Sequence, residues 1–204
     1  MRIGIDFDNT IAGYDGVFGP VARELGLITD GIGGSKNQIH DALWNREDYE
    51  QAWQRLQGQV YGKFMGRAKM MDGVDRFLAD CRDRRETVFV VSHKTEFGHQ
   101  DSDCVNLRDA ALAWMTDHGF FDAAGFAIPK KNVFFEATRR EKIARIAALD
   151  CTYFIDDLEE IFLDEAFPVG VKGVLYGPRT ELGTDAPFEA FDHWDGISEA
   201  ILGA

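Results

Sequence analysis

"IDFDNT" at residues 5–10 ends the first apolar run of this 204-residue chain and places Asp6 and Asp8 two positions apart. If the strand continued through them, both carboxylates would point to the same side. They would repel each other unless a positive charge lay between them or one kept its proton. The stretch "DNT" also has a simpler interpretation, a turn that caps the next helix, because Asp, Asn and Thr favour turns.

Several further apolar runs predict the strands of a sheet. They are rich in Val, Ile, Phe and Tyr, which is typical of strands covered on both faces. The predicted strands are residues 2–6, 87–92, 132–136, 152–156 and 172–176. Helical segments separate most of them, and Asp72 and Asp103 are predicted to cap two of these helices. This alternation predicts an α/β fold, a parallel sheet with helices on both faces, which binds ligands beyond the carboxyl ends of its strands.

The region between the first strand and the helix at 73–85 has no convincing strand. Ser35 with Gln38 resembles a capping box, and Asn45 with Asp48 could start a second helix. We therefore predict a core of residues 1–12 and 71–204 with a small helical cap inserted at 13–70. A lid over the mouth of the sheet would exclude water and shape the substrate.

The composition limits the partners and the compartment. A formal charge of −13 and a pI of about 4.7 argue against broad binding to nucleic acid or an anionic membrane. Three widely spaced cysteines fit a reducing compartment better than a disulfide framework. With no signal-like start and no apolar run long enough to cross a bilayer, we expect a cytoplasmic protein. A homodimer is compatible with the sequence, although nothing in it indicates one.

Polar residues suited to one site lie after or between the predicted strands. They are "DFDNT", Ser92 after "VFVV", Lys142 in "TRREKIARI", and Asp156 with Asp157 after "YFI". Each has an ordinary explanation by itself: a turn, a turn hydroxyl, a solvated helix residue and a helix cap. Their occurrence together and in this order indicates a shared site.

The combination resembles the haloacid dehalogenase (HAD) superfamily, in particular its phosphatase branch with a small helical cap. Asp-Phe-Asp-Asn-Thr at 6–10 matches the first motif of that family, Asp-x-Asp-x-Thr. The resemblance extends to the strand ending near Tyr176 and implies a Rossmann-like parallel sheet, with the cap inserted after the first motif. It also implies phosphate-ester hydrolysis rather than dehalogenation, because true dehalogenases lack an acid at the position of Asp8.

The resemblance also implies roles for single residues. Asp6 would attack phosphorus and form an aspartyl-phosphate, and Asp8 would act as general acid and then as general base. Lys142 would be the third catalytic residue. Mg²⁺ would be held by acidic residues of the first and fourth motifs, and substrate or phosphate by residues of the first and second motifs and the loop after Ser92. The predicted metal ligands are Asp6, Asp8, Asp156 and Asp157, and the predicted substrate-binding residues are Asn9, Thr10, Ser92, His93 and Lys94.

Charge balance supports a metal independently of the resemblance. Asp6, Asp156, Asp157 and a phosphate dianion cannot crowd together without a cation, and Mg²⁺ suits a site made only of oxygen ligands. Lys142 would add a point charge, because a capping box of Thr138 with Glu141 puts it in the first turn of a helix. Asp8 would keep its proton in the first step, with its pKa raised above the usual value of about 3.9.

Some assignments stay open at this level. Either Asp156 or Asp157 could bind the metal directly, and Glu160 could serve as an outer ligand. Lys130 and Lys131 are alternatives to Lys142 that fit the spacing less well. His93 and Lys94 begin a polar loop at 93–103 that could also be plain surface.

The sequence as a whole predicts a Mg²⁺-dependent phosphatase that hydrolyses a small phosphomonoester, a sugar phosphate or a nucleotide, through an aspartyl-phosphate intermediate. Two alternatives remain. A phosphotransferase or mutase would use the same residues with a sugar as acceptor in place of water. A non-catalytic protein that binds metal or phosphate for regulation would keep the fold without turnover, although the complete set of motif residues argues against it.

Overall fold

The computed structural model describes residues 1–31, 35–100, 103–178 and 186–203. Contacts between residues divide the chain into two compact units. Unit 1 contains Met1–Ala12, Met70–Lys94 and Gly119–Ala204, and unit 2 contains Gly13–Lys69 and Thr95–His118. The boundaries of the inserted segment fall within β2 (Ala12–Gly13) and β3 (Lys69–Met70), which pair in a two-stranded sheet.

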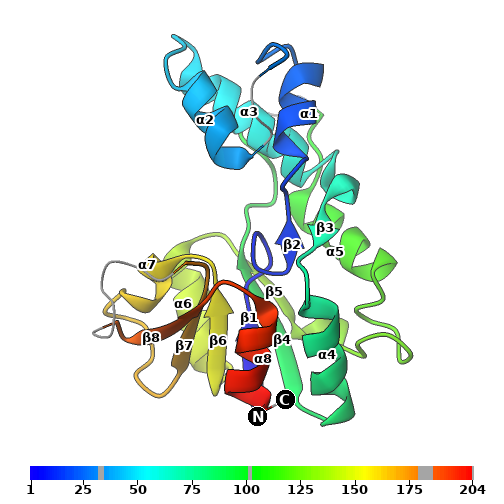
Figure 1. Ribbon diagram of the computed structural model, residues 1–204, viewed down its shortest axis with the longest axis vertical. Helices are drawn as coiled ribbons and strands as arrows, with labels where there is room; N and C mark the ends of the chain where they lie inside the picture. Colours follow the sequence, from blue (N-terminus) through cyan, green and yellow to red (C-terminus); the bar gives the residue numbers. More distant parts are fainter. Residues whose placement is uncertain (32–34, 101–102, 179–185, 204) are drawn as a thin grey trace. The chain divides into compact units, whose positions relative to one another are not determined.

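Unit 1 is built on a parallel sheet, which in the described residues has six strands in the order β5-β4-β1-β6-β7-β8 (Figure 1). The strands are β1 (Arg2–Ile5), β4 (Thr87–His93), β5 (Val133–Glu136), β6 (Tyr153–Asp156), β7 (Lys172–Tyr176) and β8 (Phe188–Phe191). The predicted α/β fold with a Rossmann-like parallel sheet is therefore confirmed. The strand β8 was not predicted.

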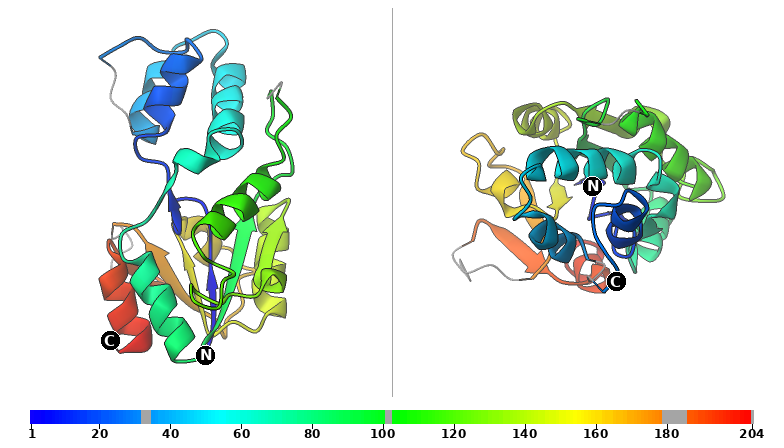
Figure 2. Two further views of the ribbon diagram at one scale, coloured as in Figure 1. Left: turned by 90° about the vertical axis from the view of Figure 1, so that its right-hand side faces the viewer. Right: turned by 90° about the horizontal axis from the view of Figure 1, so that it is seen from above.

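Helices cover both faces of this sheet, as the edge-on view in Figure 2 shows. On one face lie α4 (Val74–Asp83) and α8 (Trp194–Leu202), where the Phe77 and Trp194 rings are 5.1 Å apart. On the other lie α6 (Arg139–Ala148) and α7 (Glu159–Phe162). Their apolar side chains form one buried cluster with β4, β6 and β7: Phe89, Val91, Ile143, Ile146, Cys151, Phe154, Ile161, Phe162 and Leu175. A short 3-10 helix, η2 (Lys130–Asn132), precedes β5.

Unit 2 is helical and has an aromatic core. Its elements are α1 (Phe18–Glu24), α2 (Lys36–Leu43), α3 (Tyr49–Tyr61), the 3-10 helix η1 (Met65–Arg67) and α5 (Leu107–Asp117). Phe18 stacks on Trp53 at 5.7 Å, and Tyr14 meets Tyr61 edge-on at 4.8 Å. The capping box predicted at Ser35 is confirmed, because its side chain accepts from the Gln38 amide and Gln38 reaches back to the Ser35 amide.

Residues 95–118 belong to unit 2 by their contacts, whereas the sequence placed them in the core. The indole of Trp114 donates to the carbonyl of Ala68 at 3.0 Å. The carboxylate of Asp103 accepts from Gln59 at 3.2 Å and from Lys63 at 3.0 Å. These contacts join the segment to the inserted helices, which are distant in sequence.

The two helix caps predicted at aspartates are wrong. The Asp103 carboxylate accepts from Gln59 of α3 and from Lys63 instead. The helix α5 is capped by Asn106, whose side chain accepts from the Arg108 and Asp109 amides. The helix α4 begins after Gly73 rather than Asp72, and Gly73 has a φ of 91°. A glycine adopts this left-handed conformation without the steric cost that a Cβ brings.

The three cysteines should differ in reactivity toward thiol reagents. Cys81 and Cys151 are buried, and burial raises the pKa of their thiols to about 12 and about 11, whereas Cys104 is exposed. Because the thiolate is the reactive form, Ellman's reagent should detect one thiol in the native protein and all three after unfolding in guanidinium. The native signal should disappear in Cys104→Ser; a fast reaction that persists in this variant would show that the interior opens readily.

None of the helices in the described ranges is both long and apolar enough to cross a membrane.

Candidate active site

The order of the strands brings the predicted site residues to one edge of the sheet. β1 lies between β4 and β6, and the chain leaves β1 toward β4 and later returns to its other side. Such a reversal is where ligands bind in parallel sheets, beyond the carboxyl ends of the strands. Asp6 follows β1, Ser92 lies near the end of β4, and Asp156 ends β6.

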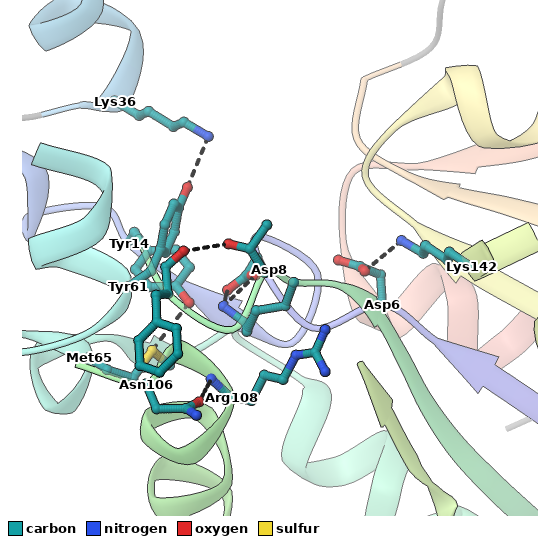
Figure 3. A network of polar contacts seen from close by, with 12 residues as sticks. Asp6, Asp8, Tyr14, Lys36, Tyr61, Met65, Asn106, Arg108 and Lys142 are labelled. Carbon is teal, nitrogen blue, oxygen red and sulfur yellow. Dashed lines mark hydrogen bonds and ion pairs between the residues drawn. The ribbon is translucent and has the colours of Figure 1, made fainter. Parts of the chain in front are cut away.

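Asp6 and Lys142 form a buried ion pair at this edge. The Asp6 amide donates to the Ile155 carbonyl at 2.8 Å, which extends the pairing of β1 with β6. The Nζ atom of Lys142 lies 2.6 Å from Asp6 Oδ1 and 2.6 Å from Asp156 Oδ2 (Figure 3 shows the pair with Asp6). Lys142 thus occupies the position beside Asp6, whereas its alternative Lys130 lies over the ring of Phe121.

The start of α6 aims Lys142 at the site. Half of the predicted capping box is present, since Thr138 Oγ1 accepts from the Glu141 amide at 3.2 Å. The Glu141 carboxylate accepts from the Ala137 amide at 3.1 Å, one residue before the Thr138 amide that a capping box would use. A helical side chain leans toward the N-terminus of its helix. The Lys142 ammonium also lies 5.6 Å from the centre of the Phe154 ring, a distance that permits a cation–π contact.

Charge and burial oppose each other in this cluster. Burial raises the pKa of Asp6 well above its usual value, and Asp156, Asp157 and Asp8 raise it further, while Lys142 lowers it. Burial alone would lower the pKa of Lys142, but Asp6 and Asp156 outweigh it and raise that pKa above its usual value. Lys142 therefore offsets only part of the effect of burial and of the neighbouring carboxylates on the pKa of Asp6.

Three carboxylates could supply ligands to a cation that adds positive charge beside Asp6. Asp6, Asp156 and Asp157 each offer an oxygen atom, and these atoms lie within 4.8 Å of one another. Asp156 is oriented by the Leu158 amide, which donates to its Oδ1 at 3.1 Å. A compact set made only of carboxylate oxygens fits a hard divalent cation such as Mg²⁺. The exposed Glu160 is not part of this set.

Asp8 lies outside the carboxylate cluster, although the sequence placed it among the metal ligands. Its carboxylate contacts Lys94, with Nζ 2.8 Å from Oδ2 and 3.0 Å from Oδ1. The strand β1 ends at Ile5, so the alternation of a continuing strand does not apply. Figure 3 shows Asp8 pointing away from Asp6 and Lys142. Each aspartate has a lysine beside it, and the protonation state expected for Asp8 stays a prediction.

The rest of the first motif forms a tight turn. Asn9 has a φ of 60°, and its amide donates to the Ala12 carbonyl at 2.8 Å. The carbonyl of Thr10 accepts from the Trp194 indole at 3.3 Å, which ties the turn to α8. Thr10 is fully buried, and its hydroxyl has no hydrogen-bond partner among the described residues.

The end of β4 separates the three residues predicted there. Ser92 and Lys94 are buried, whereas His93 between them is exposed, as expected when side chains alternate along a strand. The Nε2 atom of His93 lies 2.9 Å from the Ala137 carbonyl oxygen. The structure thus brings Ser92 and Lys94 inward and gives His93 a backbone partner instead.

The stability of the metal-free protein should depend on pH through Asp6. A carboxyl group whose pKa is raised in the folded state binds its proton more tightly there than in the unfolded chain, so its contribution to stability falls as pH rises above about 4. In EDTA, the free energy of unfolding of the wild type minus that of Asp6→Asn should therefore fall as pH rises from 4. Urea denaturation at several pH values measures this difference, and a difference that rises with pH would contradict the shift.

Comparisons with known proteins identify the fold. No family model matches the sequence, and no curated protein matches it. Among solved structures, a predicted phosphatase from Clostridium acetobutylicum is similar with a TM-score of 0.60 at 14% identity, covering 100% of this chain and 98% of that chain. A HAD-superfamily hydrolase from Ehrlichia chaffeensis gives 0.59 at 12% identity, covering 99% and 96%. A predicted phosphoglycolate phosphatase from Haemophilus somnus gives 0.56 at 14% identity, covering 98% and 96%.

At these identities the likeness establishes the fold alone. It extends over nearly the whole of this chain and of the three neighbours. The chain thus has the fold of HAD-superfamily hydrolases and phosphatases, and the resemblance first suggested by the motif at 6–10 is confirmed at the level of the fold.

Proposed function

We propose that this chain, with its HAD hydrolase fold, is a Mg²⁺-dependent phosphatase that hydrolyses a small phosphomonoester. The observation that carries the proposal is the cluster of Asp6, Lys142, Asp156 and Asp157 at the carboxyl edge of the sheet. Two buried carboxylates that contact a lysine, beside a third that could join them in binding a divalent cation, suit phosphoryl transfer, which needs positioning and charge neutralisation above all.

In the first step, an oxygen of Asp6 attacks phosphorus while the bond from phosphorus to the ester oxygen breaks. Asp8 gives its proton to the departing alcohol, and the phosphoryl group stays on Asp6 as an aspartyl-phosphate. In the second step, Asp8 takes a proton from water as the water attacks phosphorus. The bond to Asp6 then breaks, inorganic phosphate is released, and Asp8 has regained its proton.

The cluster also determines how charge is neutralised during these steps. Asp6, Asp156 and Asp157 would hold Mg²⁺, which supplies the positive charge that phosphate and Asp6 need when they approach each other. Lys142 contacts Asp6 and Asp156 directly and so fixes the orientation of the nucleophile. The carboxylate oxygen that attacks is thereby held before the substrate arrives.

The substrate class is a small metabolite, a sugar phosphate or a nucleotide. Two of the structural neighbours are described as predicted phosphatases, one of them for phosphoglycolate. The charge of −13 disfavours polyanionic substrates. A phosphotransferase or mutase would use the same first step, and the acceptor in the second step distinguishes them.

The test is phosphate release from a panel of sugar phosphates, nucleotides and p-nitrophenyl phosphate, with Mg²⁺ and with EDTA. We expect release that requires Mg²⁺ and that falls at least about 100-fold in Asp157→Asn, which loses one ligand. The matched control is Asp75→Asn, an exposed aspartate in the first turn of α4. Transfer of phosphate to an added sugar instead of water would favour the phosphotransferase. A folded protein that binds Mg²⁺ but acts on no ester would favour regulatory binding.

A further inference from the structure

A second lysine is buried at the site. The Lys94 side chain is 3% exposed, and its ammonium contacts both carboxylate oxygens of Asp8, at 2.8 and 3.0 Å. A lysine is almost never buried this far without a charged partner. Removing an ammonium from water is costly, so the pairing persists only where good geometry compensates for it.

The end of β4 fixes this lysine from its backbone outward. The Lys94 amide donates to the Glu136 carbonyl at 2.9 Å, one residue beyond the last paired position of β4 with β5. Strand alternation puts the side chain on the same inward side as Ser92. Its ammonium lies 5.6 Å from the centre of the Phe7 ring, which is itself fully buried. Backbone, neighbouring strand and ring all hold Lys94 in one place.

The two aspartates of the first motif therefore have matching but separate supports. Asp6 pairs with Lys142, whose ammonium lies 5.6 Å from the Phe154 ring. Asp8 pairs with Lys94, whose ammonium lies at the same distance from the Phe7 ring. A general acid must keep its oxygen within hydrogen-bond reach of the atom that receives the proton. Asp8 is on a turn, where its side chain would otherwise sample several rotamers.

We propose that Lys94 is a positioning residue for Asp8. Its place after Ser92 had first suggested a phosphate-binding role. The inference rests on the proposed phosphatase function. The ammonium spans both oxygens of Asp8 in the absence of substrate, which suits a support for that carboxylate. The two roles have different kinetic consequences. Loss of a residue that binds the phosphate group would lower kcat/KM for every ester by a similar factor. A misplaced general acid would lower kcat/KM only for esters whose leaving group needs a proton.

The experiment compares kcat/KM of Lys94→Met for an alkyl phosphate, glycerol phosphate, and for p-nitrophenyl phosphate. This parameter reports the steps up to formation of the aspartyl-phosphate, so the later hydrolysis does not obscure the comparison. The alcohol oxygen of glycerol phosphate needs a proton as it leaves, whereas the p-nitrophenolate released from p-nitrophenyl phosphate hardly needs one. We expect a loss of about 100-fold for glycerol phosphate and less than about fivefold for p-nitrophenyl phosphate. Asp8→Asn should show the same pattern, and the double variant should lose little more than either single variant.

Lys131→Met, an exposed lysine of η2, is the matched control and should leave both values unchanged. Equal losses of kcat/KM on the two esters would assign Lys94 to phosphate binding and overturn the inference. No loss on either ester would also overturn it. If Lys94→Met does not fold, Lys94→Arg carries the test and should shift the ratio of the two values in the same direction, but less. A wild type that hydrolyses no ester refutes the proposed function itself, whereas an active wild type with an unchanged ratio refutes only the role of Lys94.

Discussion

Replacing Asp6 by asparagine should abolish phosphate release while the protein stays folded. The amide has nearly the shape of the carboxylate but cannot attack phosphorus, so no aspartyl-phosphate forms. Removal of a nucleophile typically costs several orders of magnitude, and we expect a loss of at least about 10⁴-fold in kcat. Colorimetric phosphate release on the best ester of the panel, with Mg²⁺ in excess, measures it.

The asparagine variant should remain folded because Asp6 is a costly residue in the metal-free protein. Burial raises the pKa of this carboxyl group, so the wild type either desolvates a charge or takes up a proton there. The amide oxygen can still accept from Lys142, which lies 2.6 Å from Asp6 Oδ1. Thermal unfolding in EDTA, with Asp75→Asn as control, checks this. A folded Asp6→Asn that keeps a tenth of the activity would exclude Asp6 as nucleophile.

Local patterns were sufficient to predict most of the sheet. The runs around β1, β4, β5, β6 and β7 are dense in β-branched and aromatic residues, and their bounds differ from the structure by at most one residue. The strand β8 was missed because Phe188–Phe191 is short and interrupted by Glu189, which fits an edge of the sheet. Its pairing with β7 holds this segment as a strand, although its own composition does not predict one.

Helix starts were predicted less well, because the competing partners are distant in sequence. The capping box at Ser35 and the N-cap at Thr138 are local and were found. Asp103 has the right residue type for a cap, but Gln59 and Lys63 of unit 2 occupy its carboxylate. No pattern within the segment shows that contact.

The site was predictable in its members and less so in its pairings. The motif order indicated Asp6, Lys142, Asp156 and Asp157, and the structure brings them together. The pairing of Asp8 with Lys94 depends on β4 lying beside β1, a contact between residues far apart in the chain. One local signal could have suggested it: Ser92 and Lys94 are two apart at the end of a strand, so they share a side.

Lys142→Met should destabilise the protein strongly as well as inactivate it. The methionine keeps much of the apolar stem but removes the ammonium from between Asp6 and Asp156. Breaking a buried ion pair from one side leaves an uncompensated charge and typically costs about 3–5 kcal/mol. Urea denaturation at pH 7 in EDTA should show a loss of this size, whereas Lys131→Met should differ from the wild type by less than about 0.5 kcal/mol.

The pH dependence of that loss distinguishes an electrostatic cause from a packing cause. Lys142 lowers the pKa of Asp6, so its removal should raise that pKa further above the usual value. Folded Lys142→Met then takes up a proton at Asp6 more readily than the wild type does, and its stability deficit should shrink as pH falls from 7 toward 5. A packing defect would leave the deficit constant.

Added Mg²⁺ should also reduce the stability deficit of Lys142→Met if Asp6, Asp156 and Asp157 bind it, because the cation replaces part of the missing charge. A deficit that neither acid nor Mg²⁺ relieves would mean that Lys142 acts through its packing against Phe154 and would count against a charge-balanced site.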